Sequence, residues 1–234
     1  MGSKRAIWKY LAPIVLKDRR KDQHYIEPFC GGCNSICQVS GNRIASDINP
    51  YLIAMFKGLL NNEKVAIQID KEYYDKVRTS YRNNDDNYSD FEKGWVGFMA
   101  SYSGRFFDGG YSGNNVAGKE GIRNYIGEAI QNIYGQIEYL HGIEFHCCSY
   151  ENLPIPENSI IYCDPPYKDT KKYDRIDFNY DNFYQWCFDM KCKGHQVFIS
   201  EYDMPSDFTL LWEKEIKCNI DLKKGTRIER LYKA

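Results

Sequence analysis

The most informative segment for chemistry is Asp164-Pro165-Pro166-Tyr167, which directly follows the apolar run 160–163. Two successive prolines cannot continue a strand, and they fix the backbone so that neighbouring carbonyl groups are held in place. A carboxylate and a fixed carbonyl can together accept both hydrogens of an exocyclic amine, while a tyrosine ring offers a face on which a planar base can stack. We therefore interpret this segment as a catalytic turn that binds an aromatic amine.

The amine of a nucleobase is a poor nucleophile because its lone pair is delocalised into the ring. Accepting its two N–H groups from out-of-plane directions favours a tetrahedral nitrogen and frees that lone pair for attack. Alignment with an electrophile supplies much of the remaining rate, since good positioning is worth roughly 7 to 11 kcal/mol. Asp164 need not be a strong base, because the amine proton becomes acidic only after alkylation.

A second candidate site is the segment Ile26–Ser35, in which Gly31 and Gly32 follow another apolar run. Adjacent glycines let the backbone pass close to a ligand, although the dinucleotide motif G-x-G-x-x-G is absent. Asp47 ends the next apolar run, at a place suited to binding ribose hydroxyl groups. Because no phosphate-binding Lys-Ser/Thr follows the glycines, a nucleoside cofactor without a triphosphate fits best. Each motif alone is also typical of a simple glycine turn or a surface aspartate.

Four short apolar runs end in turn or charged residues, and each is typical of a buried strand. A helix is predicted over Pro50–Leu60, with proline in its first turn. Strands that alternate with helices predict a largely parallel sheet, with ligands at the carboxyl ends of the strands. An antiparallel hairpin from Phe208 to Tyr232, with its turn at 223–225, is predicted to close the sheet. The four predicted strands are 24–28, 43–46, 159–163 and 196–200.

The segment from about Lys71 to Leu140 interrupts this alternation and is predicted to be helical, with two apolar stripes that we expect in the core. Between the stripes lies the glycine-rich polar loop Ser101–Asn115, which contains Arg105. Such a loop either presents side chains to a nucleic-acid groove or is a flexible surface connection. The stripes are Phe91, Trp95, Phe98, Met99 and Tyr102, followed by Ile122, Tyr125, Ile126, Ala129, Ile130, Ile133, Ile137 and Leu140.

The composition of the 234-residue chain, 43% hydrophobic and 27% charged, excludes a disordered polymer. No apolar run approaches the roughly 18 residues of a membrane-spanning helix, and no secretory signal is evident, so we expect no membrane partner and a cytoplasmic location. The net charge of -1 argues against a protein that holds nucleic acid by bulk charge. The segments 1–21 and 214–233 are nevertheless basic, and they either share an anion-facing surface or are solvated charge runs.

Nine cysteines are an odd number, and a disulfide framework is not expected in the cytosol. Cys30, Cys33 and Cys37 have the spacing C-x2-C-x3-C, which is the reverse order of the radical-enzyme cluster motif. No fourth ligand follows at a zinc-ribbon distance. We therefore expect no metal, and we interpret these residues as small buried side chains around a glycine turn.

Three motifs, in the order in which they occur, resemble those of the Dam-like (D12 class, alpha-type) DNA adenine N6-methyltransferases. The resemblance implies an α/β fold, a Rossmann-like methyltransferase sheet with a helical target-recognition insertion. It also implies S-adenosyl-L-methionine as cofactor and site-specific methyl transfer to N6 of a flipped adenine in double-stranded DNA. The motifs are Pro28-Phe29-x-Gly31-Gly32, Ser46-Asp47-Ile48-Asn49 and Asp164-Pro165-Pro166-Tyr167.

The resemblance divides the chain into a cofactor-binding catalytic domain, residues 1–70 and 141–234, and a target-recognition insertion, residues 71–140. It implies that Asp47 holds the cofactor ribose and that the backbone from Phe29 to Gly32 wraps the methionine portion. Lys9-Tyr10-Leu11 is similar to the start of the family's first cofactor motif. The full set of expected cofactor contacts is Tyr10, Pro28, Phe29, Gly31, Gly32, Asp47, Ile48 and Asp164.

At the catalytic turn, the resemblance implies that Asp164 lies between cofactor and amine, that Pro166 lends its carbonyl and that Tyr167 stacks on the base, with Pro165 completing the turn. The sequence departs from the family at Leu11-Ala12-Pro13-Ile14, where Gly-Gly-Lys is frequent, and at Ser149, where Asp is common. Basic residues after the turn suit phosphate contacts or belong to a mobile polar loop. The expected DNA contacts are Arg105, Lys168, Lys171 and Lys172.

Two other functions use the same features. One is a methyltransferase with another acceptor, such as cytosine N4, an RNA base or a protein glutamine amide. The other is a non-catalytic DNA-binding protein on the same scaffold, against which the intact catalytic turn argues. The recognised DNA sequence and the oligomeric state are not predicted by these motifs, since specificity depends partly on duplex deformability.

Overall fold

A computed structural model of the chain describes residues 4–118, 121–168, 178–217 and 226–234. The chain forms two compact units. Residues 4–46 and 142–234 form one, here called the sheet unit, and residues 47–141 form the other, here called the helical unit. The helical unit begins before residue 71 because helix α2 (Pro50–Leu60) packs on helix α4 (Asp90–Ala100).

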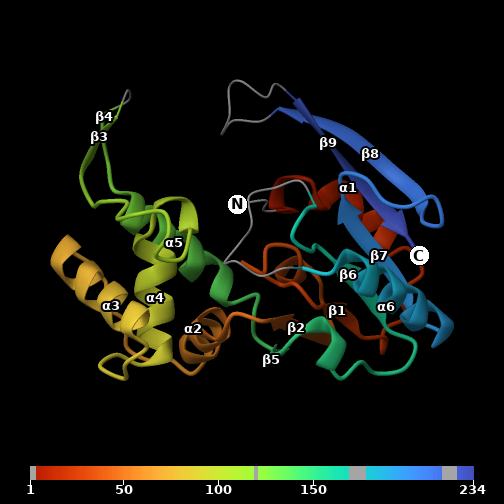
Figure 1. The fold of residues 1–234 in the computed structure, drawn as a ribbon, viewed down its shortest axis with the longest axis horizontal. Helices are drawn as coiled ribbons and strands as arrows, with labels where there is room; N and C mark the ends of the chain where they lie inside the picture. Colours follow the sequence, from red (N-terminus) through yellow and green to blue (C-terminus); the bar gives the residue numbers. More distant parts are fainter. Residues whose placement is uncertain (1–3, 119–120, 169–177, 218–225) are drawn as a thin grey trace. The chain divides into compact units, whose positions relative to one another are not determined.

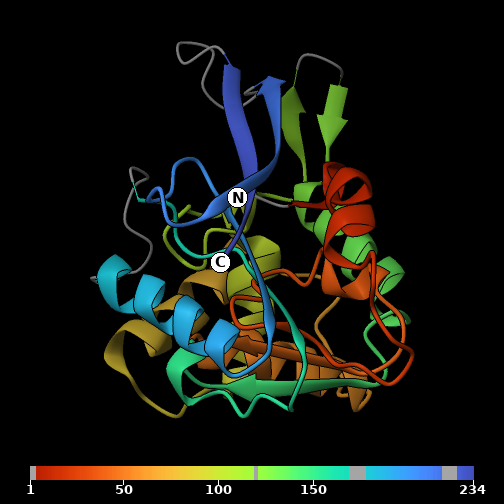
Figure 2. The same ribbon diagram turned by 90° about the vertical axis from the view of Figure 1, so that its right-hand side faces the viewer.

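The sheet unit contains a seven-stranded sheet in the order β5-β2-β1-β6-β7-β9-β8 (Figure 1). Strand β1 pairs in parallel with β2 and β6, and β6 pairs in parallel with β7. Strand β9 is antiparallel to both β7 and β8, and the two last strands run side by side as a long hairpin (Figure 1 and Figure 2). The strands are β1 (Tyr25–Glu27), β2 (Arg43–Asp47), β5 (Ile143–Cys147), β6 (Ile160–Cys163), β7 (Gln196–Glu201), β8 (Thr209–Lys217) and β9 (Thr226–Lys233).

This architecture confirms the predicted Rossmann-like α/β class, the four predicted strands and the closing antiparallel hairpin. The turn predicted at 223–225 lies outside the described residues. Strand β5 and helix α6 (Tyr180–Cys192) complete the unit and were not predicted.

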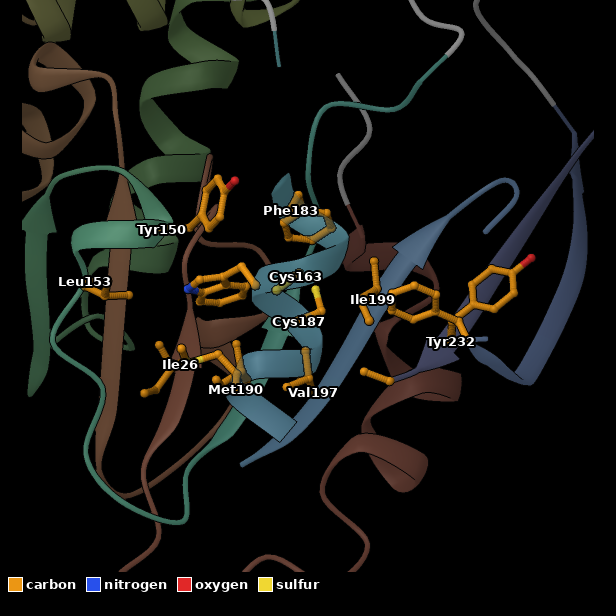
Figure 3. Packing of buried hydrophobic residues seen from close by; sticks show 14 of the residues in the cluster. Ile26, Tyr150, Leu153, Cys163, Phe183, Cys187, Met190, Val197, Ile199 and Tyr232 are labelled. Atoms are coloured by element: carbon orange, nitrogen blue, oxygen red, sulfur yellow. The ribbon is translucent and has the colours of Figure 1, made fainter. Parts of the chain in front are cut away.

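Side chains alternate between the two faces of the sheet, and a helix covers each face. On one face, the indole of Trp8 in helix α1 (Trp8–Val15) lies 6.0 Å from the ring of Tyr25 and 5.1 Å from that of Tyr162. On the other face, the apolar side of α6 packs against the neighbouring residues of the same strands (Figure 3). The cluster shown there includes Ile26, Cys163, Phe183, Cys187, Met190, Val197 and Ile199.

In the residues that the structure describes, the helical unit contains four α-helices and a two-stranded hairpin. Each helix begins at a capping side chain, as Asn49 shows by accepting hydrogen bonds from the backbone of Tyr51 and Leu52. The elements are α2, α3 (Lys71–Asn83), α4, β3 (Val116–Gly118), β4 (Gly121–Arg123) and α5 (Tyr125–Ile137). Four single turns of 3-10 helix add to both units: Lys4–Ala6, Ile36–Gln38, Tyr102–Gly104 and Tyr150–Asn152.

The two apolar stripes predicted at helical spacing within the segment 71–140 were wrong at two residues. Asn124 caps α5, so Ile122 falls ahead of the helix in β4, where it is 76% exposed. Ser101 has an extended backbone that ends α4, which places Tyr102 outside the helical register and 56% exposed. Both residues were expected in the core.

The loop from Ser101 to Asn115 buries its two phenylalanines, whereas Tyr102 stays exposed. Phe106 and Phe107 are 8% and 3% exposed, and their rings lie 5.0 and 5.3 Å from that of Tyr81 on α3. Arg105 is the more exposed side chain, and its Nη2 lies 3.3 Å from Asp108 Oδ2. Phe106 and Phe107 therefore belong to the core of the helical unit.

None of the helices in the described part of the chain has the length and apolar character that crossing a membrane requires. Within the same residues, no group of three or more His, Cys, Asp or Glu side chains is arranged to hold a metal ion. The cysteines that the structure describes are all free thiols, and Cys30 and Cys33 are buried at the glycine bend.

Candidate active site

The catalytic turn directly follows β6, the strand between β1 and β7. Pro165 is buried, and the carbonyl oxygen of Pro166 accepts a hydrogen bond from the Tyr180 hydroxyl at 2.8 Å. Tyr180 is the first residue of α6, so this bond ties the turn to the helix that covers the sheet. A carbonyl has two lone pairs, so Pro166 keeps the capacity to accept a hydrogen from an amine.

The carboxylate of Asp164 is held by a buried lysine. Lys4 Nζ lies 2.8 Å from Asp164 Oδ1, with the two side chains 4% and 26% exposed. The same ammonium lies 3.6 Å from Glu229 Oε2 and 4.7 Å from the ring centroid of Tyr167. Four side chains from the start, middle and end of the chain therefore meet at one point.

Lys4 was not predicted as a site residue. By the resemblance, the family's Gly-Gly-Lys turn was expected at Leu11–Ile14, where no lysine stands. The signal that could have found it is Gly2-Ser3-Lys4, which keeps two of the three residues of that turn at a different place.

The ionisation of this pair follows from burial and charge. Burial by itself lowers the pKa of the Lys4 ammonium, but Asp164 and Glu229 outweigh it and bring that pKa above its ordinary value. Burial raises the pKa of the Asp164 carboxyl, and Lys4 opposes that rise. The cation at residue 4 therefore favours the ionised form of Asp164, the form that accepts hydrogen bonds from an amine.

Three contacts fix the orientation of the Tyr167 ring. Its hydroxyl donates to Glu229 Oε2 at 3.0 Å, and its ring stands perpendicular to that of Tyr202, with centroids 4.4 Å apart. Lys4 lies over one face of the ring. A base that stacks on that face requires the ammonium to move, whereas stacking on the opposite face does not.

Two buried acids flank the catalytic strand. Glu27 ends β1, accepts a hydrogen bond from the Tyr25 hydroxyl at 2.7 Å and has a pKa that burial raises to about 8. Glu201 ends β7, accepts a hydrogen bond from the backbone of Tyr202 at 2.7 Å and has a pKa that burial raises to about 7. Both acids are thus partly protonated near neutral pH, which limits the negative charge around Asp164.

The glycine bend after β1 has open backbone at its glycines, while the residues just before them pack in the core. Pro28 is buried, and the Phe29 ring packs 5.4 Å from that of Tyr150 and 5.6 Å from that of Phe183. Gly31 has φ +45°, and a Cβ atom there would meet no atom within 4 Å. The bend therefore leaves open space beside its backbone, as a ligand cradle requires. The backbone N–H of Cys30 donates to the Ser46 carbonyl at 2.8 Å, which joins the bend to the end of β2, and Gly32 is exposed.

The remaining expected cofactor residues lie in different settings. Asp47 is the last residue of β2, the strand beside β1, and its carboxylate accepts a hydrogen bond from the Asn49 backbone at 3.0 Å. Ile48 is 55% exposed. Tyr10 packs against the terminal hairpin, stacked on Trp212 with centroids 6.1 Å apart and with Lys214 Nζ 3.8 Å from its ring centroid.

The residues expected to bind DNA are distributed over both units. Lys168 is exposed just after the catalytic turn, with Nζ 5.9 Å from the ring centroid of Tyr180, and Arg105 belongs to the helical unit. Lys171 and Lys172 lie outside the described residues. Ser149, at the position where the family commonly has Asp, caps a 3-10 turn by accepting a hydrogen bond from the Glu151 backbone at 3.4 Å.

The chain is similar to several known proteins. The type II methyltransferase M.FokI of Planomicrobium okeanokoites is 23% identical over 188 residues, which cover 71% of this chain and 28% of M.FokI. The chain thus spans well under half of that relative. Two solved structures also align with the chain. One is HI0767, a candidate methylase of Haemophilus influenzae, with 11% identity and a TM-score of 0.35; the alignment covers 98% of this chain and 97% of that one. The other is SMU.472, a candidate methyltransferase complexed with SAH, with 14% identity and a TM-score of 0.38; the alignment covers 99% of this chain and 52% of that one.

The sequence model of one family matches residues 1–203, which include the glycine bend, the end of β2 and the catalytic turn. The chain therefore belongs to the D12 class N6 adenine-specific DNA methyltransferase family.

Proposed function

We propose that the chain transfers a methyl group from S-adenosyl-L-methionine to N6 of an adenine in double-stranded DNA. The observation that carries the proposal is the carboxylate of Asp164 at the carboxyl end of a central parallel strand, 2.8 Å from a buried lysine and beside the ring of Tyr167. In open α/β sheets, ligands bind at that edge. Membership of the D12 class family supports the choice of adenine N6 as acceptor.

The chain's own groups position the amine. Asp164 accepts one N–H hydrogen, and a carbonyl of the turn, which we assign to Pro166, accepts the other, so that the nitrogen lone pair points away from the turn. Lys4 favours the carboxylate form of Asp164 throughout. When bound, S-adenosyl-L-methionine supplies an electrophilic methyl carbon on a sulfonium. As the new C–N bond forms, the bond between the methyl carbon and sulfur would break and its electron pair would stay on sulfur, giving a neutral thioether as leaving group. The surplus amine proton leaves to Asp164 or to water.

The glycine bend fits the cofactor that the family uses. Gly31 leaves room that a side chain would fill, and the Phe29 ring fixes the bend to the core. We infer that the backbone from Phe29 to Gly32 wraps the methionine portion and that Asp47 binds the ribose hydroxyls. Pro28, Ile48 and Tyr10 complete the proposed contacts.

Access to N6 requires the adenine to leave the duplex, and Tyr167 is the proposed stacking partner of the extruded base. We assign the recognition of the DNA target to the segment 71–140 and phosphate contacts to Arg105, Lys168, Lys171 and Lys172. Phosphate contacts orient a duplex without selecting its sequence. The cytoplasm is the inferred compartment.

The test is transfer of labelled methyl groups from S-adenosyl-L-methionine to double-stranded DNA, single-stranded DNA, RNA and a protein mixture, followed by digestion of each polymer. We expect label in N6-methyldeoxyadenosine from double-stranded DNA. Label in N4-methylcytosine, in RNA or in a glutamine amide, or no transfer at all with DNA bound, would overturn the proposal in favour of the corresponding alternative.

A further inference from the structure

Glu229 lies on β9, beyond residue 203, where the match to the family ends. Its side chain is only 16% exposed, and its Oε2 atom contacts two groups of the candidate site: the Tyr167 hydroxyl at 3.0 Å and Lys4 Nζ at 3.6 Å. We propose that Glu229 is a positioning residue for methyl transfer, acting by holding the Tyr167 ring beside Asp164. This inference rests on the proposed function.

The strand that carries Glu229 supports both aromatic rings of the site. Residues 227 and 229 point to the same face of β9 because side chains alternate along a strand. Arg227 Nη1 donates to the Tyr202 hydroxyl at 2.9 Å, and the Tyr202 ring stands perpendicular to Tyr167. The closing hairpin thus fixes the hydroxyl ends of two tyrosines whose rings meet at the catalytic turn.

Glu229 constrains Tyr167 where the proline turn does not. Pro165 and Pro166 fix the backbone before the tyrosine, but they leave the torsion angles of its side chain free. A hydrogen bond from the hydroxyl to a largely buried carboxylate removes that freedom at the far end of the ring. The face on which a base would stack is therefore already oriented before the base arrives.

Glu229 also balances charge. Lys4 carries one positive charge between two carboxylates, Asp164 at 2.8 Å and Glu229 at 3.6 Å. With both carboxylates ionised, the three groups carry a net charge of -1, which suits a site that must accept a cationic sulfonium. Without Glu229 the three-residue cluster becomes neutral.

The test is a double-mutant cycle of Glu229→Ala and Tyr167→Phe, with kcat and KM measured for both DNA and S-adenosyl-L-methionine. We expect each single variant to lower kcat about tenfold, the usual effect of losing one hydrogen bond to a charged group, with KM for the cofactor changed less than about twofold. The double variant should be little slower than Glu229→Ala, because both changes remove the hydrogen bond between Tyr167 and Glu229. Glu229→Gln, whose side-chain carbonyl can accept the same hydrogen bond, should restore part of kcat.

Glu215→Ala is the matched control, since Glu215 is an exposed carboxylate on the neighbouring strand, and thermal unfolding shows whether each variant is folded. A roughly hundredfold loss in the double variant, an equal loss in Glu215→Ala or an unchanged kcat in Glu229→Ala would overturn the role of Glu229 while wild-type activity upholds the proposed function. A wild-type protein that methylates no adenine would overturn both.

Discussion

Replacing Lys4 by methionine removes the cation that faces Asp164 while keeping a similar side-chain length. Lys4 is 4% exposed, so water cannot take its place, and Asp164 is left in a site that disfavours its charge. Removing one partner of a fully buried pair costs about 3 to 5 kcal/mol. Since the Asp164 side chain is 26% exposed and partly hydrated, we expect a loss of about 2 kcal/mol in the free energy of unfolding at pH 8.

The size of this loss should depend on pH. Burial raises the pKa of Asp164 in the folded protein, and removing Lys4 raises it further. The added cost is therefore fully present above the folded pKa of Asp164 in the variant. It is lost as pH falls from that value to the lower folded pKa of Asp164 in wild type, below which both folded proteins are protonated. The difference between Lys4→Met and wild type should shrink from pH 8 to acidic pH.

Urea unfolding followed by tryptophan fluorescence measures both effects. Asp164→Asn in the Lys4→Met background removes the carboxylate that has lost its lysine partner, and it should recover most of the lost free energy of unfolding. Lys17→Met is the control, since Lys17 is an exposed lysine just after α1. If Lys4→Met costs the same free energy with and without Asp164→Asn, the two charges are not coupled and this part of the argument is wrong.

Three further changes test separate parts of the structure. Asp47→Ala should weaken binding of S-adenosyl-L-methionine about tenfold by calorimetry, because one charged hydrogen-bond acceptor is lost, with little change in kcat at saturating cofactor. Burial raises the pKa of Glu201 in the folded protein to about 7, so the folded state holds this proton more tightly than the unfolded state does. As pH rises from 4.5 to 7, the free energy of unfolding of wild type, measured in urea, should therefore fall by up to about 3 kcal/mol relative to that of Glu201→Gln. Gly94→Ala should destabilise the helical unit by about 1 to 3 kcal/mol in the same assay, since a Cβ there would overlap the Tyr51 carbonyl and separate α4 from α2.

Each of these has a clear contrary result. Unchanged cofactor affinity in Asp47→Ala would remove the ribose contact. Equal pH dependence of stability in Glu201→Gln and wild type would mean that Glu201 ionises normally. A fully stable Gly94→Ala variant would show that the two helices do not need their close approach.

The position of the turn 164–167 could be predicted from sequence because the signal for it is local. Asp164 and the two prolines follow a strand of four buried residues, and the strand end itself sets their position in the sheet. The same holds for Gly31 and for Asp47, which end or follow predicted strands. Once the strand before such a motif is predicted correctly, the place of the motif in the sheet follows.

The partners of Asp164 could not be predicted in this way. Lys4 precedes Asp164 by more than half of the chain, and Glu229 lies on the second strand of the terminal hairpin, so only the tertiary fold makes them neighbours. Burial of Phe106 and Phe107 is likewise tertiary, because a glycine-rich loop has no periodicity that marks a buried face.

Two missed elements did carry a signal. Strand β5 has alternating apolar residues at 143 and 145, and α6 follows a capping Asn179 with buried residues at helical spacing.

The measurement that tests the central claim most directly is single-turnover methyl transfer by Asp164→Ala, with wild type alongside and circular dichroism to verify the fold. We predict that wild type forms N6-methyladenine in double-stranded DNA and that the variant, folded and still able to bind S-adenosyl-L-methionine, forms none above background. Wild-type turnover by Asp164→Ala would contradict the assignment of amine positioning to this carboxylate.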